Sequence, residues 1–150
     1  MSVMETKLKL ESDLKDALRA GDDLRKNTLR LALSAIRLAE IDRGLKLDES
    51  AVIAILQKEI KSRHESIEDA QRAARPELEA AALAEIKILQ VYLPEAIDPA
   101  ELEAQAKQAI AEVGATSVRE MGQVMKVLMP RLAGRATGDQ VSQAVRKLLQ

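Results

Sequence analysis

The apolar side chains available for a core restrict the fold of this chain more than any motif does. Leu, Ala, Ile, Val and Met supply nearly all of them, with one tyrosine, Tyr92, and no Phe or Trp in 150 residues. Such residues pack best between closely spaced helices, and few segments alternate apolar and polar positions as a strand would. We therefore predict an all-α fold, in a chain long enough for one domain or two small ones.

Glycines and prolines divide the chain into segments with the periodicity of helices. Gly21 and Gly44 are typical of helix ends, and Pro76 suits the first turn of a helix, where its missing N–H is not needed. Pro130 is expected to kink or end its helix near Leu128. The predicted helices run from about residue 2 to 20, 24 to 43, 49 to 74, 76 to 92, 99 to 113, 117 to 128 and 139 to 149.

Polar side chains at the starts of these segments predict N-caps. Asp22 or Asp23, and then Asp48, can accept hydrogen bonds from free amides of the first helical turn. Asp98 with Glu101, and Ser117 with Glu120, have the three-residue spacing of a capping box. The second pair is the cleanest capping signal in the sequence.

Two prolines mark a boundary in the organisation of the chain. Pro94 and Pro99 interrupt helical structure on both sides of residues 93–98. We predict a four-helix N-terminal domain at residues 1–94 and a three-helix C-terminal domain at residues 98–150.

Signatures of catalysis are lacking in the sequence. There is no cysteine, which excludes disulfides, thiolate zinc sites and cysteine nucleophiles. The single histidine, His64, shares a helix face with Glu68, but two ligands do not make a metal site. No P-loop, H-E-x-x-H, G-x-S-x-G or G-x-G-x-x-G motif is present. We expect no catalytic residue, no metal and no cofactor, and His64 on a helix surface.

The sequence also lacks the signals that direct a chain to a membrane. Residues 1–10 are charged and contain no apolar block of the signal-peptide type. No run approaches the eighteen or so apolar residues that a membrane span requires. On these grounds we expect a soluble, cytoplasmic protein without a membrane partner.

Positive charge is concentrated near the carboxyl end. Residues 117–150 carry six basic and two acidic side chains, a net charge of +4 in a chain whose total is −1. Positive charge beside a flexible turn is what an anionic partner requires. The basic residues are Arg119, Lys126, Arg131, Arg135, Arg146 and Lys147.

A glycine-punctuated loop lies within this basic segment. Arg135 stands between Gly134 and Gly138. Glycine permits close approach of the backbone to a phosphate, and arginine offers bidentate donors. The alternative is a helix end followed by a loop with incidental charge, and the residues alone do not separate the two interpretations.

A second group of basic residues follows the helix predicted at 24–43. The favoured interpretation is a solvated face with ion pairs inside the helix, such as Arg37 with Glu40. Lys58, Lys61 and Arg63 are interpreted in the same way on the next helix. The residues of the first group are Arg25, Lys26, Arg30, Arg37 and Arg43.

The scarcity of aromatic residues limits how nucleic acid could be bound. Proteins that bind single strands stack bases on Phe, Tyr or Trp, and Tyr92 alone cannot provide such a platform. Any RNA contact is therefore expected to involve the backbone and folded shape. A net charge near zero argues against binding to double-stranded DNA.

Several blocks of the sequence resemble the YqeY family, and the C-terminal part resembles the tail domain of GatB, the tRNA-engaging subunit of the bacterial tRNA-dependent amidotransferase. The resemblance covers essentially the whole chain. The blocks that carry it are K-E-I-K-S-R-H-E-S-I at residues 58–67, A-E-I-K-I-L-Q-V-Y-L-P at 84–94, and G-A-T-S-V-R-E-M-G-Q-V-M-K-V-L-M-P-R-L-A-G-R-A-T-G at 114–138; L-R-L-A-L-S-A-I-R at 29–37 and E-I-D-R at 40–43 also match.

This resemblance implies a helical N-terminal domain, a three-helix tail and no established catalytic activity. It implies that the tail contacts tRNA, as in GatB and in some glutaminyl-tRNA synthetases to which it is fused. Two departures are the segments at 74–76 and 81–83, where glycine and acidic residues are usual, and Ala133, where lysine is common. The matched positions for tRNA contact are Gly122, Lys126, Arg131, Gly134, Arg135 and Gly138.

We therefore predict a non-catalytic accessory protein that binds tRNA, or an amidotransferase or aminoacyl-tRNA synthetase subunit, through its C-terminal domain. Carbon–nitrogen ligase activity with glutamine as amido donor is associated with this chain only through the family resemblance. The alternative function is a helical protein-interaction adaptor that does not bind RNA.

Overall fold

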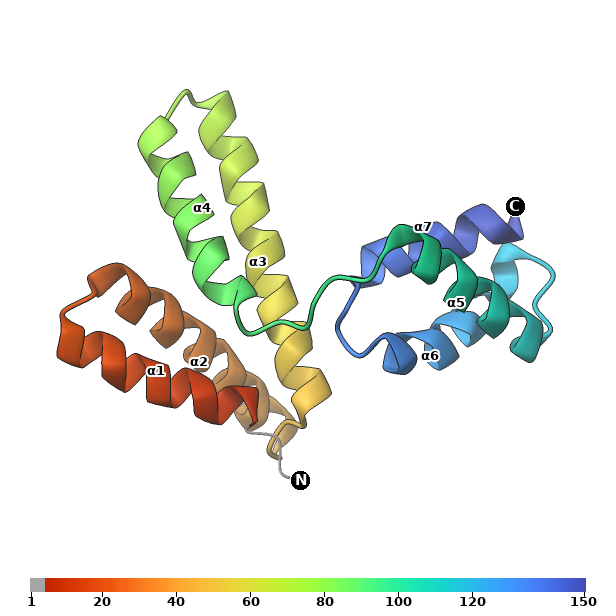
Figure 1. Cartoon of the computed structure of the whole chain (residues 1–150), viewed down its shortest axis with the longest axis horizontal. Coiled ribbons are helices and arrows are strands. Elements are labelled where there is room, and N and C mark those ends of the chain that lie inside the picture. Colours follow the sequence, from red (N-terminus) through yellow and green to blue (C-terminus); the bar gives the residue numbers. More distant parts are fainter. Residues whose placement is uncertain (1–4) are drawn as a thin grey trace. The chain divides into compact units, whose positions relative to one another are not determined.

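A computed structural model describes residues 5–150, and in this part of the chain the regular secondary structure is helical, without a strand (Figure 1). The all-α prediction is confirmed. The predicted start of the first helix near Ser2 lies outside the described residues. The helices are α1 (Thr6–Ala20), α2 (Asp23–Arg43), α3 (Glu49–Arg72), α4 (Pro76–Gln90), α5 (Pro99–Val113), α6 (Met121–Leu132) and α7 (Gly138–Leu149), with a 3₁₀ turn at Val118–Glu120 before α6.

The chain divides into two compact units, one ending at Leu93 and the other spanning Pro94–Gln150. In the first unit, α1 and α2 form one antiparallel hairpin, and α3 and α4 form another (Figure 1). Burial of one apolar stripe from each helix supplies the main stabilisation of such an assembly. Its core includes Leu10, Leu29, Leu33, Ile36, Leu56, Ile86, Leu89 and Tyr92.

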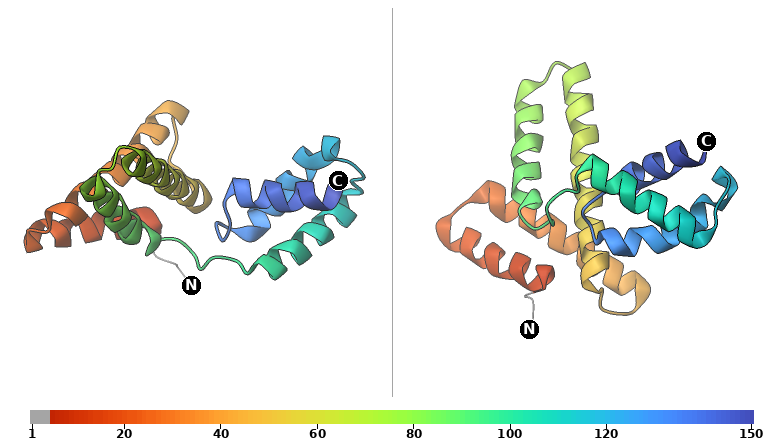
Figure 2. Two further views of the ribbon diagram at one scale, coloured as in Figure 1. Left: turned by 90° about the horizontal axis from the view of Figure 1, so that it is seen from above. Right: turned by 45° about the vertical axis from the view of Figure 1, so that its right-hand side comes forward.

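The second unit consists of α5, α6 and α7, each of which packs against the other two (Figure 2). Apolar residues four positions apart on α6 and α7 point inward because residues i and i+4 lie on one helix face. Ala106 and Ala109 of α5 let the helices approach closely. The core includes Leu102, Ala106, Ala109, Val124, Leu128, Leu132, Val141 and Val145.

Most helix boundaries follow the local signals in the sequence. Gly21 and Gly44 adopt left-handed φ values of 67° and 68°, and their N–H groups donate to carbonyls of the preceding turn. An L residue would be strained in that conformation, so both positions favour glycine. Asp22, Asp48 and Asp98 accept hydrogen bonds from backbone amides as N-caps.

Both predicted capping boxes are wrong. Asp98 accepts from the N–H of Ala100, but the Glu101 carboxylate is bound by an arginine instead of the backbone. Ser117 makes no side-chain capping bond, and Glu120 accepts from the N–H and hydroxyl of Thr116, both at 3.1 Å. The box forms at the start of α7, where Thr137 and Gln140 bond reciprocally at 3.1 and 2.9 Å.

Other boundaries also differ from the sequence prediction, among them the ends of α3 and α6. α3 ends at Arg72, two residues early, because Ala74 takes a φ of 53° that no helix accommodates. α6 continues through Pro130 to Leu132. A proline loses its own bond to the preceding turn and crowds the carbonyl four residues earlier, but the residues after it can still complete the last turn of the helix.

Candidate functional site

The six residues of the candidate tRNA site follow one helix–loop–helix stretch of the C-terminal unit. Gly122 and Lys126 lie on α6, and Arg131 lies in its last turn. Gly134 and Arg135 belong to the loop at residues 133–137, and Gly138 is the first residue of α7.

Gly122 and Lys126 share the exposed face of α6. They are four residues apart and alternate with the buried residues Val124, Leu128 and Leu132, which places them on the opposite side from the core. A Cβ atom added at Gly122 would meet no other atom within 4 Å. The space in front of Gly122 is therefore open, and packing does not explain a glycine there.

Arg131 is bound within the unit. Its Nη1 lies 2.5 Å from Oε2 of Glu112 on α5, and both side chains are about two-fifths exposed. Opposite charges in contact with water attract only weakly, because solvent screens them. Arg131 is thus accessible but already has an anionic partner.

Arg135 has more partners than any other residue of the candidate site. Its guanidinium binds Glu101 through two parallel bonds, Nη1–Oε1 at 3.1 Å and Nη2–Oε2 at 3.2 Å. This hydrogen-bonded carboxylate raises the pKa of Arg135. The Arg135 carbonyl accepts from the N–H of Ile97 at 2.9 Å, and Nε donates to the Glu95 carbonyl at 3.4 Å.

The loop between α6 and α7 has a defined shape. Ala133 and Gly134 both take left-handed conformations, with φ values of 46° and 83°. Ala136 is buried in the core of the unit, and Thr137 caps α7. The loop is therefore held at both ends, and glycine at position 134 is required by the backbone conformation.

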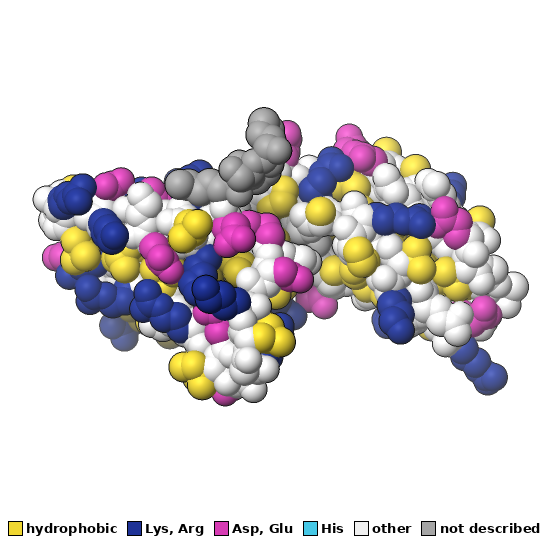
Figure 3. All heavy atoms as spheres, turned by 90° about the horizontal axis from the view of Figure 1, so that it is seen from below, with side chains coloured by type: hydrophobic (Ala, Val, Ile, Leu, Met, Phe, Trp, Pro, Cys, Tyr) yellow, Lys and Arg dark blue, Asp and Glu magenta, His cyan; other side chains and the backbone are white. Residues whose placement is uncertain are grey.

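Acidic residues of α5 and of the segment before it offset the basic C-terminal segment within the same unit. Residues 94–150 have no net charge, because one lysine and five acidic residues precede the +4 segment; these are Lys107, Glu95, Asp98, Glu101, Glu103 and Glu112. Figure 3 shows Lys and Arg side chains (dark blue) spread over the visible face of this unit rather than gathered in one patch. The positive segment predicted from sequence thus becomes a mixed surface.

Four basic side chains of the segment form no ion pair within the described residues, and all are exposed. They are Arg119, Lys126, Arg146 and Lys147. These cations are available to an external anion without displacing a carboxylate. The sequence pattern favours Arg131 and Arg135 instead, because their partners on α5 lie about 20 to 35 residues away in the chain and leave no local signal.

The basic residues of α2 follow the prediction only in part. Lys26 forms an ion pair inside the helix, with Asp23 at 3.2 Å. Glu40 accepts from Lys7 Nζ at 2.8 Å and from the N–H of Leu47 at 3.0 Å, and these two hydrogen bonds lower its pKa. The predicted ion pair between Arg37 and Glu40 is therefore wrong. Arg25 lies 3.7 Å from Asp13 of α1, so it also has a partner outside its own helix.

Arg63 and Tyr92 are buried in the N-terminal unit, where both bind carboxylates of the same unit. Arg63, predicted to be solvated, is buried, and it binds Glu59 and Glu85, each at 3.1 Å. The Tyr92 hydroxyl donates to Asp13 Oδ2 at 2.5 Å, and its ring is largely buried. Burial of the phenol raises the pKa of Tyr92 most, and the hydrogen bond to Asp13 raises it further. A buried ring cannot stack on a base.

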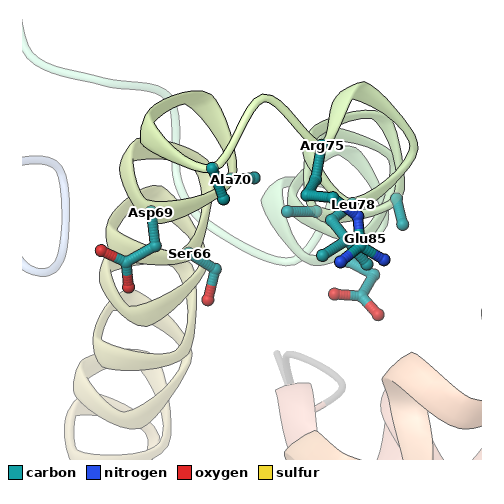
Figure 4. A pocket seen from close by; sticks show the side chains of 9 residues that line it. Ser66, Asp69, Ala70, Arg75, Leu78 and Glu85 are labelled. Carbon is teal, nitrogen blue, oxygen red and sulfur yellow. The ribbon is translucent and has the colours of Figure 1, made fainter.

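An open groove of about 510 Å³ lies between α3 and α4 near their connection (Figure 4). Its lining consists of four alanines together with Ser66, Asp69, Arg75, Leu78 and Glu85. A serine nucleophile requires an adjacent base, and no histidine lines this groove. His64 is exposed on α3, and within residues 5–150 no cluster of three His, Cys, Asp or Glu could hold a metal ion.

Comparison with protein families identifies the chain. The family described as Yqey-like protein matches residues 7–149, which is nearly the whole sequence. The chain belongs to this family. The resemblance inferred from the sequence blocks is confirmed, and the match covers both units of the Yqey-like fold described above.

Curated relatives share the name "Altered inheritance of mitochondria protein 41, mitochondrial". The relative from Lachancea thermotolerans is 39% identical over 107 residues, 71% of this chain and 57% of the relative. That from Vanderwaltozyma polyspora is 41% identical over 87 residues, 57% of this chain and 47% of the relative. That from Pyrenophora tritici-repentis is 29% identical over 144 residues, 94% of this chain and 79% of the relative. The chain spans about half the length of the first two.

These names place the relatives in mitochondria, so the prediction of a cytoplasmic location is wrong. An apolar block is not the signal to look for here, since mitochondrial targeting segments are amphipathic and rich in arginine. Within residues 5–150, none of the helices is both long and apolar enough to span a membrane.

Proposed function

We propose that this Yqey-like protein is a non-catalytic accessory protein that binds tRNA through its C-terminal unit. It would act on tRNA alone or together with a tRNA-handling enzyme, such as a tRNA-dependent amidotransferase or an aminoacyl-tRNA synthetase. The resemblance of residues 114–138 to the GatB tail domain motivates the choice of tRNA.

The exposed face of α6 is the observation that carries the proposal. Lys126 supplies a positive charge without a competing carboxylate, and Gly122 leaves open space one turn away. A phosphodiester backbone can approach a helix closely where no side chain stands in front of it. Arg119, Arg146 and Lys147 add exposed positive charge in the same segment.

Arg131 and Arg135 would join the interface by exchanging partners. A phosphate offers the same bidentate acceptor geometry as the carboxylates of Glu112 and Glu101. Exposed ion pairs are weak enough to be replaced, but the released carboxylates would then repel the RNA. We therefore expect these two arginines to contribute less to affinity than Lys126.

The buried position of Tyr92 favours a folded RNA over a single strand. With no exposed aromatic ring among the described residues, stacking cannot hold unpaired bases. Contacts to backbone and shape suit a structured RNA such as tRNA.

A mobility-shift experiment with total tRNA tests the proposal, with double-stranded DNA of similar length as control, at two salt concentrations. Salt-sensitive retardation of tRNA, with weaker retardation of DNA, is the expected result. Absence of tRNA binding at low salt would exclude the proposal and favour the adaptor function.

A further inference from the structure

A row of leucines lies on the side of α2 that points away from the core. Leu24, Leu31 and Leu38 are seven residues apart and 42%, 57% and 60% exposed, and Ile41 is 75% exposed. We call these four residues the α2 stripe. The opposite side of the helix packs into the core through Leu29, Leu33 and Ile36.

Arginines follow one edge of the α2 stripe. Arg30 and Arg37 directly precede Leu31 and Leu38, so they share the same seven-residue spacing. Both are exposed, and neither forms an ion pair within the described residues. Glu40, one turn beyond Arg37, is occupied by Lys7 and by the N–H of Leu47.

The spacing of the α2 stripe fits a helix. Apolar residues at intervals of seven and then three face a second helix along a shared seam, and charges beside the seam select the partner. A membrane surface would instead favour a broad apolar face with Trp or Phe, and the α2 stripe is narrow and contains no aromatic residue.

We propose that the α2 stripe docks an acidic amphipathic helix of a partner protein. The partner's apolar side chains would pack on Leu31 and Leu38, and its Asp or Glu residues would pair with Arg30 and Arg37. A second copy of the chain fits less well: in an antiparallel pair, Arg30 of each copy would face Arg37 of the other. This site lies on the N-terminal unit and does not depend on tRNA binding.

Two designed helical peptides test this inference with the full-length chain. Both carry leucines at seven-residue spacing, one flanked by glutamates and the other by lysines, and binding is measured by fluorescence anisotropy. The acidic peptide is expected to bind in the micromolar range and the basic peptide about tenfold more weakly or not at all. Sedimentation with phosphatidylcholine–phosphatidylserine vesicles and analytical ultracentrifugation test the membrane and the second copy.

Variants locate the binding to the α2 stripe. Leu31→Ser with Leu38→Ser should weaken the acidic peptide by about tenfold or more. The matched control, Leu18→Ser with Leu83→Ser, changes two leucines of similar exposure on α1 and α4 and should leave binding unchanged. Arg30→Glu with Arg37→Glu should reverse the preference toward the basic peptide. Circular dichroism checks that each variant keeps its helicity.

Each other outcome contradicts the inference. Absence of acidic-peptide binding overturns it, as does equal binding of the two peptides or equal loss in the control variant. Binding to the vesicles that is lost with Leu31→Ser and Leu38→Ser assigns the surface to a membrane. A dimer that the same variant dissociates assigns it to a second copy.

Discussion

The guanidinium of Arg135 is held against the carboxylate of Glu101 by two parallel bonds of 3.1 and 3.2 Å. This pair joins the loop after α6 to the first turn of α5, and the Arg135 carbonyl bonds to Ile97 beside it. Arg135, the residue with the clearest sequence signal for phosphate contact, therefore has an internal anion to displace before it can bind an external one.

Replacing Glu101 should release Arg135 for RNA. Glu101→Gln removes one negative charge beside the basic segment and the ionic partner of Arg135, so tRNA binding should become tighter and more salt-dependent. The control is Glu103→Gln on the same helix, which removes the same charge from a residue paired with Lys107. A gain that is equal in the two variants would reflect net charge alone and not the release of Arg135.

Gly122→Ala should separate stability from binding. The added methyl group meets no atom within 4 Å, and alanine stabilises a helix over glycine by about 0.5–1 kcal/mol. Chemical denaturation should show this gain, while tRNA affinity falls because the backbone can no longer be approached closely. Gln123→Ala, at the next exposed position, is the control. Unchanged tRNA affinity in Gly122→Ala would remove Gly122 from the interface.

The parts of the fold that sequence predicted are those specified locally. Gly21, Gly44 and Asp48 end or begin helices through bonds to residues within a few positions, so their effect is visible in the sequence. The capping box was predicted at Ser117, which has the familiar Ser-x-x-Glu spacing, but it forms at Thr137 and Gln140, which have the same spacing. Propensity alone does not decide between two such signals.

The candidate site was only partly accessible from sequence. Positive charge and glycines were evident, but Glu112 and Glu101 precede Arg131 and Arg135 by 19 and 34 positions. Pairing at that distance depends on how α5 packs against α6 and α7. Arg63 was misjudged for the same reason, since Glu85 of α4 helps to bury its charge. Tertiary packing, which local patterns do not encode, determines the partners of all three arginines.

Tyr92→Phe should destabilise the N-terminal unit. The change keeps the ring but removes the hydroxyl bond to Asp13, and a hydrogen bond to a charged acceptor contributes about 1.5–3 kcal/mol. Urea denaturation at neutral pH measures the loss. Full stability in the variant would show that the short bond to Asp13 contributes nothing.

The same variant tests the raised pKa of Tyr92. The phenol is harder to ionise in the folded protein than in the unfolded chain, whose pKa is about 10. The contribution of the neutral Tyr92 hydroxyl to the free energy of unfolding is therefore complete below about pH 10, and it is lost as the pH rises toward the folded pKa. The stability difference between wild type and Tyr92→Phe should shrink above about pH 10. A difference that grows with pH would mean that the folded state favours the phenolate.

Ala74→Gly should stabilise the α3–α4 hairpin. Ala74 has a φ of 53°, a conformation that costs an L residue roughly 1–2 kcal/mol, whereas the added entropy of glycine costs about 0.5–1 kcal/mol. We expect a net gain of about 0.5–1 kcal/mol in unfolding experiments. Ala73→Gly is the neighbouring control: Ala73 has a φ of −84° and should lose stability. A loss in both variants would contradict the assigned strain.

The central claim is tested most directly by the salt dependence of tRNA affinity, measured in two variants that each lack a pair of lysines. Lys126→Ala with Lys147→Ala removes two exposed cations from the C-terminal unit, and Lys58→Ala with Lys87→Ala removes two from the N-terminal unit. If the C-terminal unit holds tRNA phosphates, the first variant binds more weakly, and the slope of log affinity against log salt falls by about 1.5. The second variant keeps the wild-type slope. Equal effects of the two variants, or no effect of the first, would contradict a tRNA site on the C-terminal unit.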